Sequence, residues 1–160
     1  MSEDQLPQKG VRLSYEEAWE TLTNSHTGVF TTLRRDGTPI SLPVWYAVID
    51  RKIYVSTPGN SKKVMRIKNN SRSSFLVESG ELWAELKAVH LTGTAEVVQP
   101  FDELAGRIRA EIERKYSAFR TAPKQMPDAS KKHYGQTSAT IRFTPDERIV
   151  SWDNSKLNLK

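Results

Sequence analysis

The sequence predicts a mainly β protein in which six or seven short strands form a closed or partly closed barrel flanked by helices. Runs rich in β-branched and aromatic residues recur along the chain, and turn signals such as Asp36-Gly37 separate them. Two longer segments instead show apolar residues at helical spacing. The 160 residues contain no internal repeat and no linker long enough to separate two domains, so one domain is expected.

The domain is expected to span residues 14–160, after a polar tail at residues 1–13 that we predict to be disordered. Ser14 followed by Glu17 is a capping-box pattern and predicts the start of a helix over residues 14–25. Gly28 is expected to end this segment. Apolar residues recur at helical spacing between these limits, at Ala18, Trp19 and Leu22.

Three strands are expected next. The first covers Val29–Arg35, and the Asp36-Gly37 hairpin signal leads into a second strand over Pro39–Ile49. Asp50-Arg51 then turns the chain into a third strand at Ile53–Thr57.

Later strands are separated by two helices. A short basic helix is expected at residues 61–68, before a break at Asn69-Asn70. A longer helix is expected at residues 101–119, after Pro100, with an apolar face formed by Leu104, Ile108, Ile112 and Phe119. The remaining strands are expected at Ser74–Val77, His90–Val98, Thr137–Phe143 and Arg148–Trp152, with Gly93 as a β-bulge. The polar segment Thr121–Lys132 is expected to be a loop that ends in a short helix.

Composition excludes several classes of protein. No cysteine is present, so disulfides, thiolate catalysis and Cys-ligated metals are excluded. The three histidines are far apart and lack a carboxylate pattern, so no metal site is expected. No apolar run is long enough to span a membrane and the first ten residues do not resemble a signal peptide, so a cytoplasmic location is expected.

Positive charge is concentrated between Arg51 and Val77, where seven Lys or Arg residues occur without an Asp or Glu. Within it a predicted strand ends in Ser56-Thr57, and a predicted helix begins near Ser61-Lys62-Lys63. Hydroxyls, free amides and lysines at a helix N-terminus favour a phosphate. The alternative interpretation is a solvated basic helix face, and the charge pattern alone does not separate the two.

Five segments are informative through their order and spacing: Thr31–Tyr46, Ile53–Thr57, Ser61–Val64, Leu91–Val97 and Ile149–Asp153. They resemble the pyridoxamine 5′-phosphate oxidase-like split β-barrel family, and the resemblance covers roughly residues 14–155. The closing segment Ile149–Asp153 is similar to the ends of the actinobacterial members of this family, the flavin/deazaflavin oxidoreductases.

The resemblance implies a homodimeric split barrel that holds FMN or the deazaflavin F420 in a groove between the subunits. It assigns the cofactor phosphate to Ser56, Thr57, Ser61, Lys62 and Lys63, with Lys63 and Thr57 as the strongest candidates. The strand Leu42-Pro43-Val44-Trp45 would pass along the ring system. Many FMN-binding relatives also carry an arginine near Ser61, which this chain lacks.

The expected activity is hydride transfer, with F420 or FMN, to or from a small conjugated compound. F420 is preferred over FMN because its polyanionic tail would suit Lys62, Lys63, Arg66, Lys68 and Arg72. The alternatives are an FMN-dependent enzyme of pyridoxamine-phosphate-oxidase type and a non-catalytic flavin- or deazaflavin-binding protein. Other members of the family bind haem.

No catalytic side chain is assigned, because the cofactor itself carries out hydride chemistry. Tyr46, Tyr54 and Tyr134 are possible proton donors, and the sequence does not choose among them. Trp45 is either a core or interface aromatic or a residue that flanks the ring system. A nucleic-acid partner is not expected, because aromatic residues are not interleaved with the basic ones as stacking requires.

Overall fold

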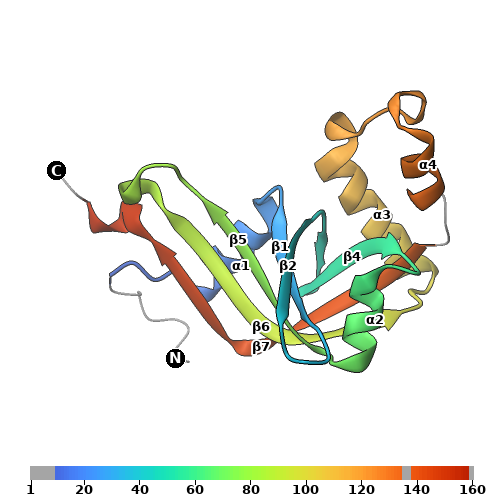
Figure 1. Ribbon diagram of the computed structural model, residues 1–160. Coiled ribbons are helices and arrows are strands. Elements are labelled where there is room, and N and C mark those ends of the chain that lie inside the picture. The colour runs from blue at the N-terminus through green and yellow to red at the C-terminus, as the bar shows by residue number, and fades with distance from the viewer. Residues whose placement is uncertain (1–9, 135–137, 159–160) are drawn as a thin grey trace.

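A computed structural model describes residues 10–134 and 138–158 of the chain. Seven antiparallel strands form one sheet in the order β2-β1-β5-β6-β7-β4-β3, and the sheet curls into a half-barrel flanked by helices (Figure 1). This arrangement confirms the predicted mainly β, barrel-like fold. The strands are β1 (Gly28–Leu33), β2 (Pro39–Val44), β3 (Ala47–Ile49), β4 (Lys52–Pro58), β5 (Arg72–Ser79), β6 (Lys87–Val98) and β7 (Ser138–Asp153). The α-helices of the described ranges are α1 (Tyr15–Asn24), α2 (Lys62–Asn69), α3 (Asp102–Tyr116) and α4 (Asp128–Tyr134).

The curl of the sheet follows from one short connection. Strands β2 and β3 lie at opposite edges of the sheet, yet only Trp45 and Tyr46 separate them in the chain. Three Cα–Cα steps span at most about 11 Å, so the end of β2 and the start of β3 must lie close together. A flat seven-stranded sheet could not bring its edges that close, because neighbouring strands are about 4.8 Å apart.

The single strand predicted over Pro39–Ile49 is therefore wrong. The chain leaves the ladder after Val44, which pairs with Gly28, and re-enters it at Ala47, which pairs with Tyr54. Alternating apolar residues continue through the break, and for this reason the sequence pattern gives no sign of the change of edge. Gly28 also differs from expectation: α1 ends at Asn24, and Gly28 begins β1.

The prediction of two separate strands near the C-terminus is wrong, because residues Ser138–Asp153 form the single long strand β7. Its first residues pair with β4, and it pairs with β6 along most of its length. The register shifts between Leu91 and Gly93, which confirms the predicted bulge, and Gly93 lies opposite Pro145. Proline is tolerated at such a position because a bulge frees the backbone from part of its ladder. Thr137, the first residue of the predicted strand, lies outside the described residues.

The main core fills the concave side of the sheet. Phe30, Phe75 and Phe143 come from three strands and are almost completely buried, with ring centroids 6.2 to 6.4 Å apart. Helix α1 packs against this core through Ala18, Trp19 and Leu22, as its spacing predicts. The predicted capping box is present, since Ser14 and Glu17 exchange hydrogen bonds.

A second, smaller core lies between α3 and the strands β3 and β4. Ala47, Ile49, Tyr54 and Ile108 are buried there, and Leu104 and Ile112 pack against them. Phe119 was predicted on the same helical face, but α3 ends at Tyr116 and Phe119 is 61% exposed in a following 3-10 turn. Tyr116 is buried instead.

The turn between β3 and β4 links the sheet to both helices. Asp50 and Arg51 have positive φ angles of 50° and 60°, as a two-residue hairpin turn requires. Asp50 pairs with Arg107 of α3 at 2.9 Å, and Arg51 pairs with Glu16 of α1 at 2.8 Å. Each pair is exposed and is worth about 1 kcal/mol or less, so the pairs mainly fix orientation.

The folded domain begins before residue 14, the start that the sequence predicted. Leu13 is buried and its amide donates to Ser151, while the amide of Asp153 donates to the Val11 carbonyl. The rest of the predicted tail, residues 1–9, lies outside the described residues. The expected polar loop after α3 contains a 3-10 turn at Pro123–Gln125 and ends in α4, as predicted.

Replacing Gly93 with alanine should destabilise the protein by about 1–3 kcal/mol, because a Cβ atom there would lie 2.3 Å from the Thr144 carbonyl oxygen. Gly106 in α3 is the matched control, since a Cβ atom there would meet nothing within 4 Å. Gly106→Ala should stabilise the protein by about 0.5–1 kcal/mol. Urea unfolding of both variants measures the difference, and equal effects would contradict the assigned bulge.

Candidate functional site

A pocket of about 480 Å³ lies where the two edges of the curled sheet approach each other. One side comes from the chain before β1 and from the end of β2, and the other from β4 and the start of α2. The residues that line it are Thr27, Pro43, Val44, Trp45, Val55, Ser56, Thr57, Pro58, Ser61 and Lys63. Seven of the ten residues predicted to bind a cofactor are therefore brought together in one cavity, and Leu42, Lys62 and Arg66 are not among its lining residues.

The N-terminus of α2 supplies the polar side of this pocket. The Ser61 hydroxyl accepts a hydrogen bond from the Val64 amide and caps the helix. Val64 and Ile67 are buried in the main core, which fixes the helix beside β1 and β6. The amides of Lys62 and Lys63 lie in the first turn, where a helix provides no acceptor. These amides and the helix dipole favour an anion.

Lys63 adds the positive charge of the site. Its burial, and next the neighbouring Arg66, lower the pKa of the Lys63 ammonium below its ordinary value. A partly desolvated ammonium gains from a nearby anion more than an exposed one does. Lys62 is exposed and outside the pocket. Of these two adjacent lysines, only Lys63 lines the cavity.

The other basic residues predicted to suit the F420 tail do not line the pocket. The Arg66 Nε donates to the Thr32 hydroxyl on β1 at 3.2 Å, and its Nη1 is buried without a partner among the described residues. Arg72 forms a two-bond pair with Asp146 on β7. Lys68 is exposed and is not part of the pocket lining. Lys63 is thus the one member of that set that lines the cavity within the described chain.

Strands β2 and β4 supply the apolar part of the pocket. Pro43, Val44 and Val55 line it together with Trp45, which is 39% exposed. Trp45 is therefore neither fully buried core nor free surface. Ser56 and Thr57 line the same cavity from β4, and Thr57 is buried. An apolar cleft with a few polar groups at one side is the usual form of a small-molecule site.

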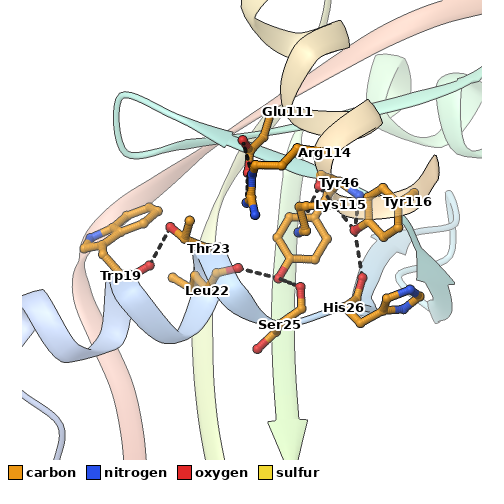
Figure 2. Close-up of polar contacts among 10 residues, drawn as sticks. All are labelled: Trp19, Leu22, Thr23, Ser25, His26, Tyr46, Glu111, Arg114, Lys115 and Tyr116. Atoms are coloured by element: carbon orange, nitrogen blue, oxygen red, sulfur yellow. Dashed lines mark hydrogen bonds and ion pairs between the residues drawn. The ribbon is translucent and has the colours of Figure 1, made fainter. Parts of the chain in front are cut away.

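Tyr46 is surrounded by hydrogen-bond partners from two helices (Figure 2). Its hydroxyl lies within hydrogen-bond distance of the Leu22 and Ser25 carbonyl oxygens at the end of α1. Its amide donates to the Tyr116 hydroxyl at 3.0 Å, and its carbonyl accepts from Lys115 Nζ at 3.1 Å. Burial, and next the proximity of Tyr116, raise the pKa of Tyr46.

These contacts exclude Tyr46 as a proton donor to the pocket, because its hydroxyl is directed at α1. Tyr54 is buried in the core under α3, and it too is not part of the pocket lining. The third suggested donor, Tyr134, has a side chain outside the described residues. Sequence reasoning also missed Lys115 and Tyr116, although Ile108, Ile112 and Tyr116 follow one helical face at four-residue spacing.

A larger cavity of about 730 Å³ lies between α1 and the neighbouring ends of β5 and β6. Its lining includes Glu17, Glu20, Glu78 and Asp153, with Lys87 as a basic member. This excess of carboxylates disfavours an anionic ligand. The described residues contain no group of three or more His, Cys, Asp or Glu placed to hold a metal ion. Within the same ranges, none of the helices has the length and apolar character that crossing a membrane requires.

The fold agrees with comparisons to known proteins. The family described as pyridoxamine 5′-phosphate oxidase matches residues 15–148, so the chain belongs to that family. A search of curated proteins finds no match. The conserved hypothetical protein Rv2991 from Mycobacterium tuberculosis is 28% identical, with a TM-score of 0.77, and the match covers 97% of this chain and 94% of that one.

Two more distant structures show the same fold. A FAD-binding protein from Mesorhizobium loti is 19% identical with a TM-score of 0.66, and the match covers 88% of this chain and 96% of that chain. HutZ, the heme storage protein from Vibrio cholerae, is 14% identical with a TM-score of 0.63, over 86% of this chain and 94% of that chain.

Lys115 should give the stability of the protein a measurable pH dependence. Burial lowers the pKa of its ammonium from 10.5 to about 8, while Glu111 opposes the shift and Arg114 adds to it. Between those two pKa values the unfolded chain binds more protons than the folded one, so the free energy of unfolding should rise with pH above about pH 8. Lys115→Met should remove this rise.

Urea unfolding at pH 7, 8 and 9 measures the effect. The exposed lysine of α2 provides the control, and Lys62→Met should keep the wild-type profile. A rise of the same size in Lys115→Met as in the wild-type protein would contradict the assignment of a half-buried charge over the Tyr46 ring, 3.6 Å from its centroid.

Proposed function

We propose that the protein is an oxidoreductase that binds FMN or F420 in the pocket between β2, β4 and α2 and transfers hydride to or from a small conjugated compound. One observation carries the proposal: a helix N-terminus with Ser61 and Lys63 faces the same cavity as the apolar end of β2. Both cofactors combine a phosphate with a planar ring system, so they need both kinds of surface in one site.

The residues present fit such a group. Ser61, Ser56 and Thr57 provide hydroxyls, the first turn of α2 provides amides, and Lys63 provides a charge at the pocket wall. Pro43 and Val44 provide apolar contact, and a strand edge offers backbone groups to a polar ring edge. When bound, the cofactor would supply the hydride chemistry, while the chain positions it and limits the access of water.

Haem is supported less well as the occupant. The described lining of the pocket contains no histidine, methionine, tyrosine or cysteine, which are the usual axial ligands of haem iron. The name of the heme storage relative therefore provides weaker support than the name of the FAD-binding one. The same lining also lacks a carboxylate, so no side chain besides Lys63 offers itself for proton transfer. A non-catalytic cofactor-binding protein is the second candidate, because the names of the FAD-binding and heme storage relatives describe binding and no reaction.

F420 and FMN differ in what the site must hold beyond the first phosphate. The basic stretch between Arg51 and Val77 supports F420 because of its polyanionic tail. The direction of Arg66 and Arg72 away from the pocket supports FMN, since a single phosphate requires no more than the cradle at Ser61 and Lys63.

A second copy of the chain is the proposed protein partner. Apolar side chains are exposed at one end of the molecule, where the 3-10 turn Trp83–Glu85 contacts the turn Asn154–Leu157. Trp83, Trp152 and Leu157 are exposed there in the single chain. Large exposed apolar groups at one place indicate an interaction surface. Sedimentation analysis of the purified protein tests this assembly, and a monomer at micromolar concentration would contradict it.

Fluorescence titration of the cofactor-free protein with FMN, riboflavin and F420 tests the cofactor assignment. Lys63→Ala should weaken FMN binding about tenfold, because a charge-assisted contact to phosphate is lost, and should leave riboflavin affinity unchanged. Lys62→Ala is the matched control, since this neighbour is exposed and outside the pocket, and it should bind FMN as the wild-type protein does. Turnover of reduced cofactor with an acceptor then separates an enzyme from a binding protein.

Equal losses in the two lysine variants would show that only the general positive charge attracts the phosphate. If the wild-type protein binds none of the three ligands, the proposed function is wrong. An effect of Lys62→Ala on F420 but not on FMN would assign the exposed lysine to the tail of F420.

A further inference from the structure

Four aromatic rings form a cluster beside the pocket, and one of them, Trp45, lines it. The Trp45 ring lies parallel to that of Tyr116, with centroids 4.4 Å apart and an interplanar angle of 7°. His26 meets both rings edge-on, at 5.9 Å from Trp45 and 5.1 Å from Tyr116. Phe119 meets His26 at 4.5 Å. The cluster draws on the segment before β1, the β2–β3 connection and the end of α3.

Trp45 is held in place from behind. Tyr116 is fully buried, and its hydroxyl donates to the His26 carbonyl at 2.7 Å while it accepts from the Tyr46 amide at 3.0 Å. The stacked tyrosine thus covers one face of the indole ring. Trp45 nevertheless stays 39% exposed and lines the cavity. A rigid aromatic plane with part of its surface open to a pocket loses little conformational entropy when a ligand binds to it.

The surroundings of this plane suit an uncharged, planar ligand that carries a carbonyl group. His26 and Phe119 are exposed members of the same cluster; neither lines this pocket, and His26 lines the acidic cavity beside α1. Thr27 lines the pocket, and its hydroxyl lies 3.1 Å from His26 Nδ1. This pair provides a polar contact for a carbonyl oxygen at the rim. No carboxylate lines the described pocket, and its one ammonium, Lys63, belongs to the α2 side.

We propose that Trp45 is the stacking surface for a planar conjugated acceptor, with Tyr116 as the positioning residue that holds the indole ring. The proposal rests on the proposed function for the other side of the pocket, where α2 receives the cofactor phosphate. It assigns Pro43 and Val44 to the cofactor and Trp45 to the acceptor. Stacking of this kind is worth about 0.5–1.5 kcal/mol beyond the burial of area.

Equilibrium dialysis of the cofactor-free protein with menadione, a planar quinone, tests the proposal without requiring turnover. Trp45→Leu should weaken menadione binding at least fivefold, and Trp45→Phe should weaken it less, because a smaller ring remains. Tyr116→Leu should also weaken it, whereas Tyr116→Phe should keep most of the affinity, since the stacked ring is retained. Tyr15→Leu is the control, because Tyr15 is a comparably exposed aromatic residue of α1 outside the pocket.

The dissociation constant of FMN, measured on the same variants, separates the two proposals. An unchanged FMN affinity in Trp45→Leu together with weaker menadione binding supports the acceptor site. A parallel loss of both ligands would overturn it, because the cofactor ring would then occupy the indole surface. Unchanged menadione binding in Trp45→Leu, or no binding to the wild-type protein, would also overturn it. Menadione binding without FMN binding would leave the stacking site standing and refute the proposed function.

Discussion

The two-residue connection between β2 and β3 is the constraint from which the rest of the architecture follows. Because Trp45 and Tyr46 join opposite edges of one sheet, the sheet has to curl until those edges meet. The concave face then encloses the phenylalanine core, and a cleft is left where the edges approach without pairing. The pocket lies in this cleft, so its position is a consequence of how the barrel closes.

A connection of this kind removes two residues from the strand ladder inside the protein, and their backbone groups need other partners. Tyr46 is fully buried, and side chains of α3 supply those partners: the Tyr116 hydroxyl for its amide and the Lys115 ammonium for its carbonyl. The Tyr46 hydroxyl in turn donates to the Leu22 carbonyl oxygen near the C-terminal end of α1. One residue thus joins two helices to the break in the sheet (Figure 2). Helix α3 provides the hydrogen-bond partners of the Tyr46 backbone, and its Tyr116 ring stacks on Trp45. The contacts that accompany the closure of the barrel therefore also shape the pocket.

The sequence could predict those features that depend on local chemistry. The capping box at Ser14, the hairpin turn at Asp50-Arg51, the bulge at Gly93 and the junction of β4 with α2 each follow from residues close together in the chain. The residues Ser56, Thr57, Ser61 and Lys63 were predicted from that junction, and the structure gathers them around one cavity. The family resemblance predicted that the strand now seen as β2 forms the second side of the cofactor pocket, which no local sequence pattern indicated.

Features that depend on tertiary contacts could not be predicted in this way. The break at Trp45-Tyr46 is invisible to periodicity because apolar residues continue through it. The continuity of β7 depends on its pairing with β6, where Pro145 lies opposite the bulge residue Gly93. Arg66 was expected to contact an anion, but its side chain donates a hydrogen bond to Thr32 on β1. Charge in a sequence window shows how much positive potential is present, whereas the direction of each side chain is decided by packing.

The most direct test of this account is a crystal structure of the protein with FMN. The account predicts that the phosphate lies at the N-terminus of α2, in contact with Ser61 and Lys63, and that the ring system extends along Pro43 and Val44 at the end of β2. Density for the cofactor in the acidic cavity beside α1, or a phosphate held by Arg66 or Arg72 instead, would contradict the claim that the cleft left by barrel closure is the cofactor site.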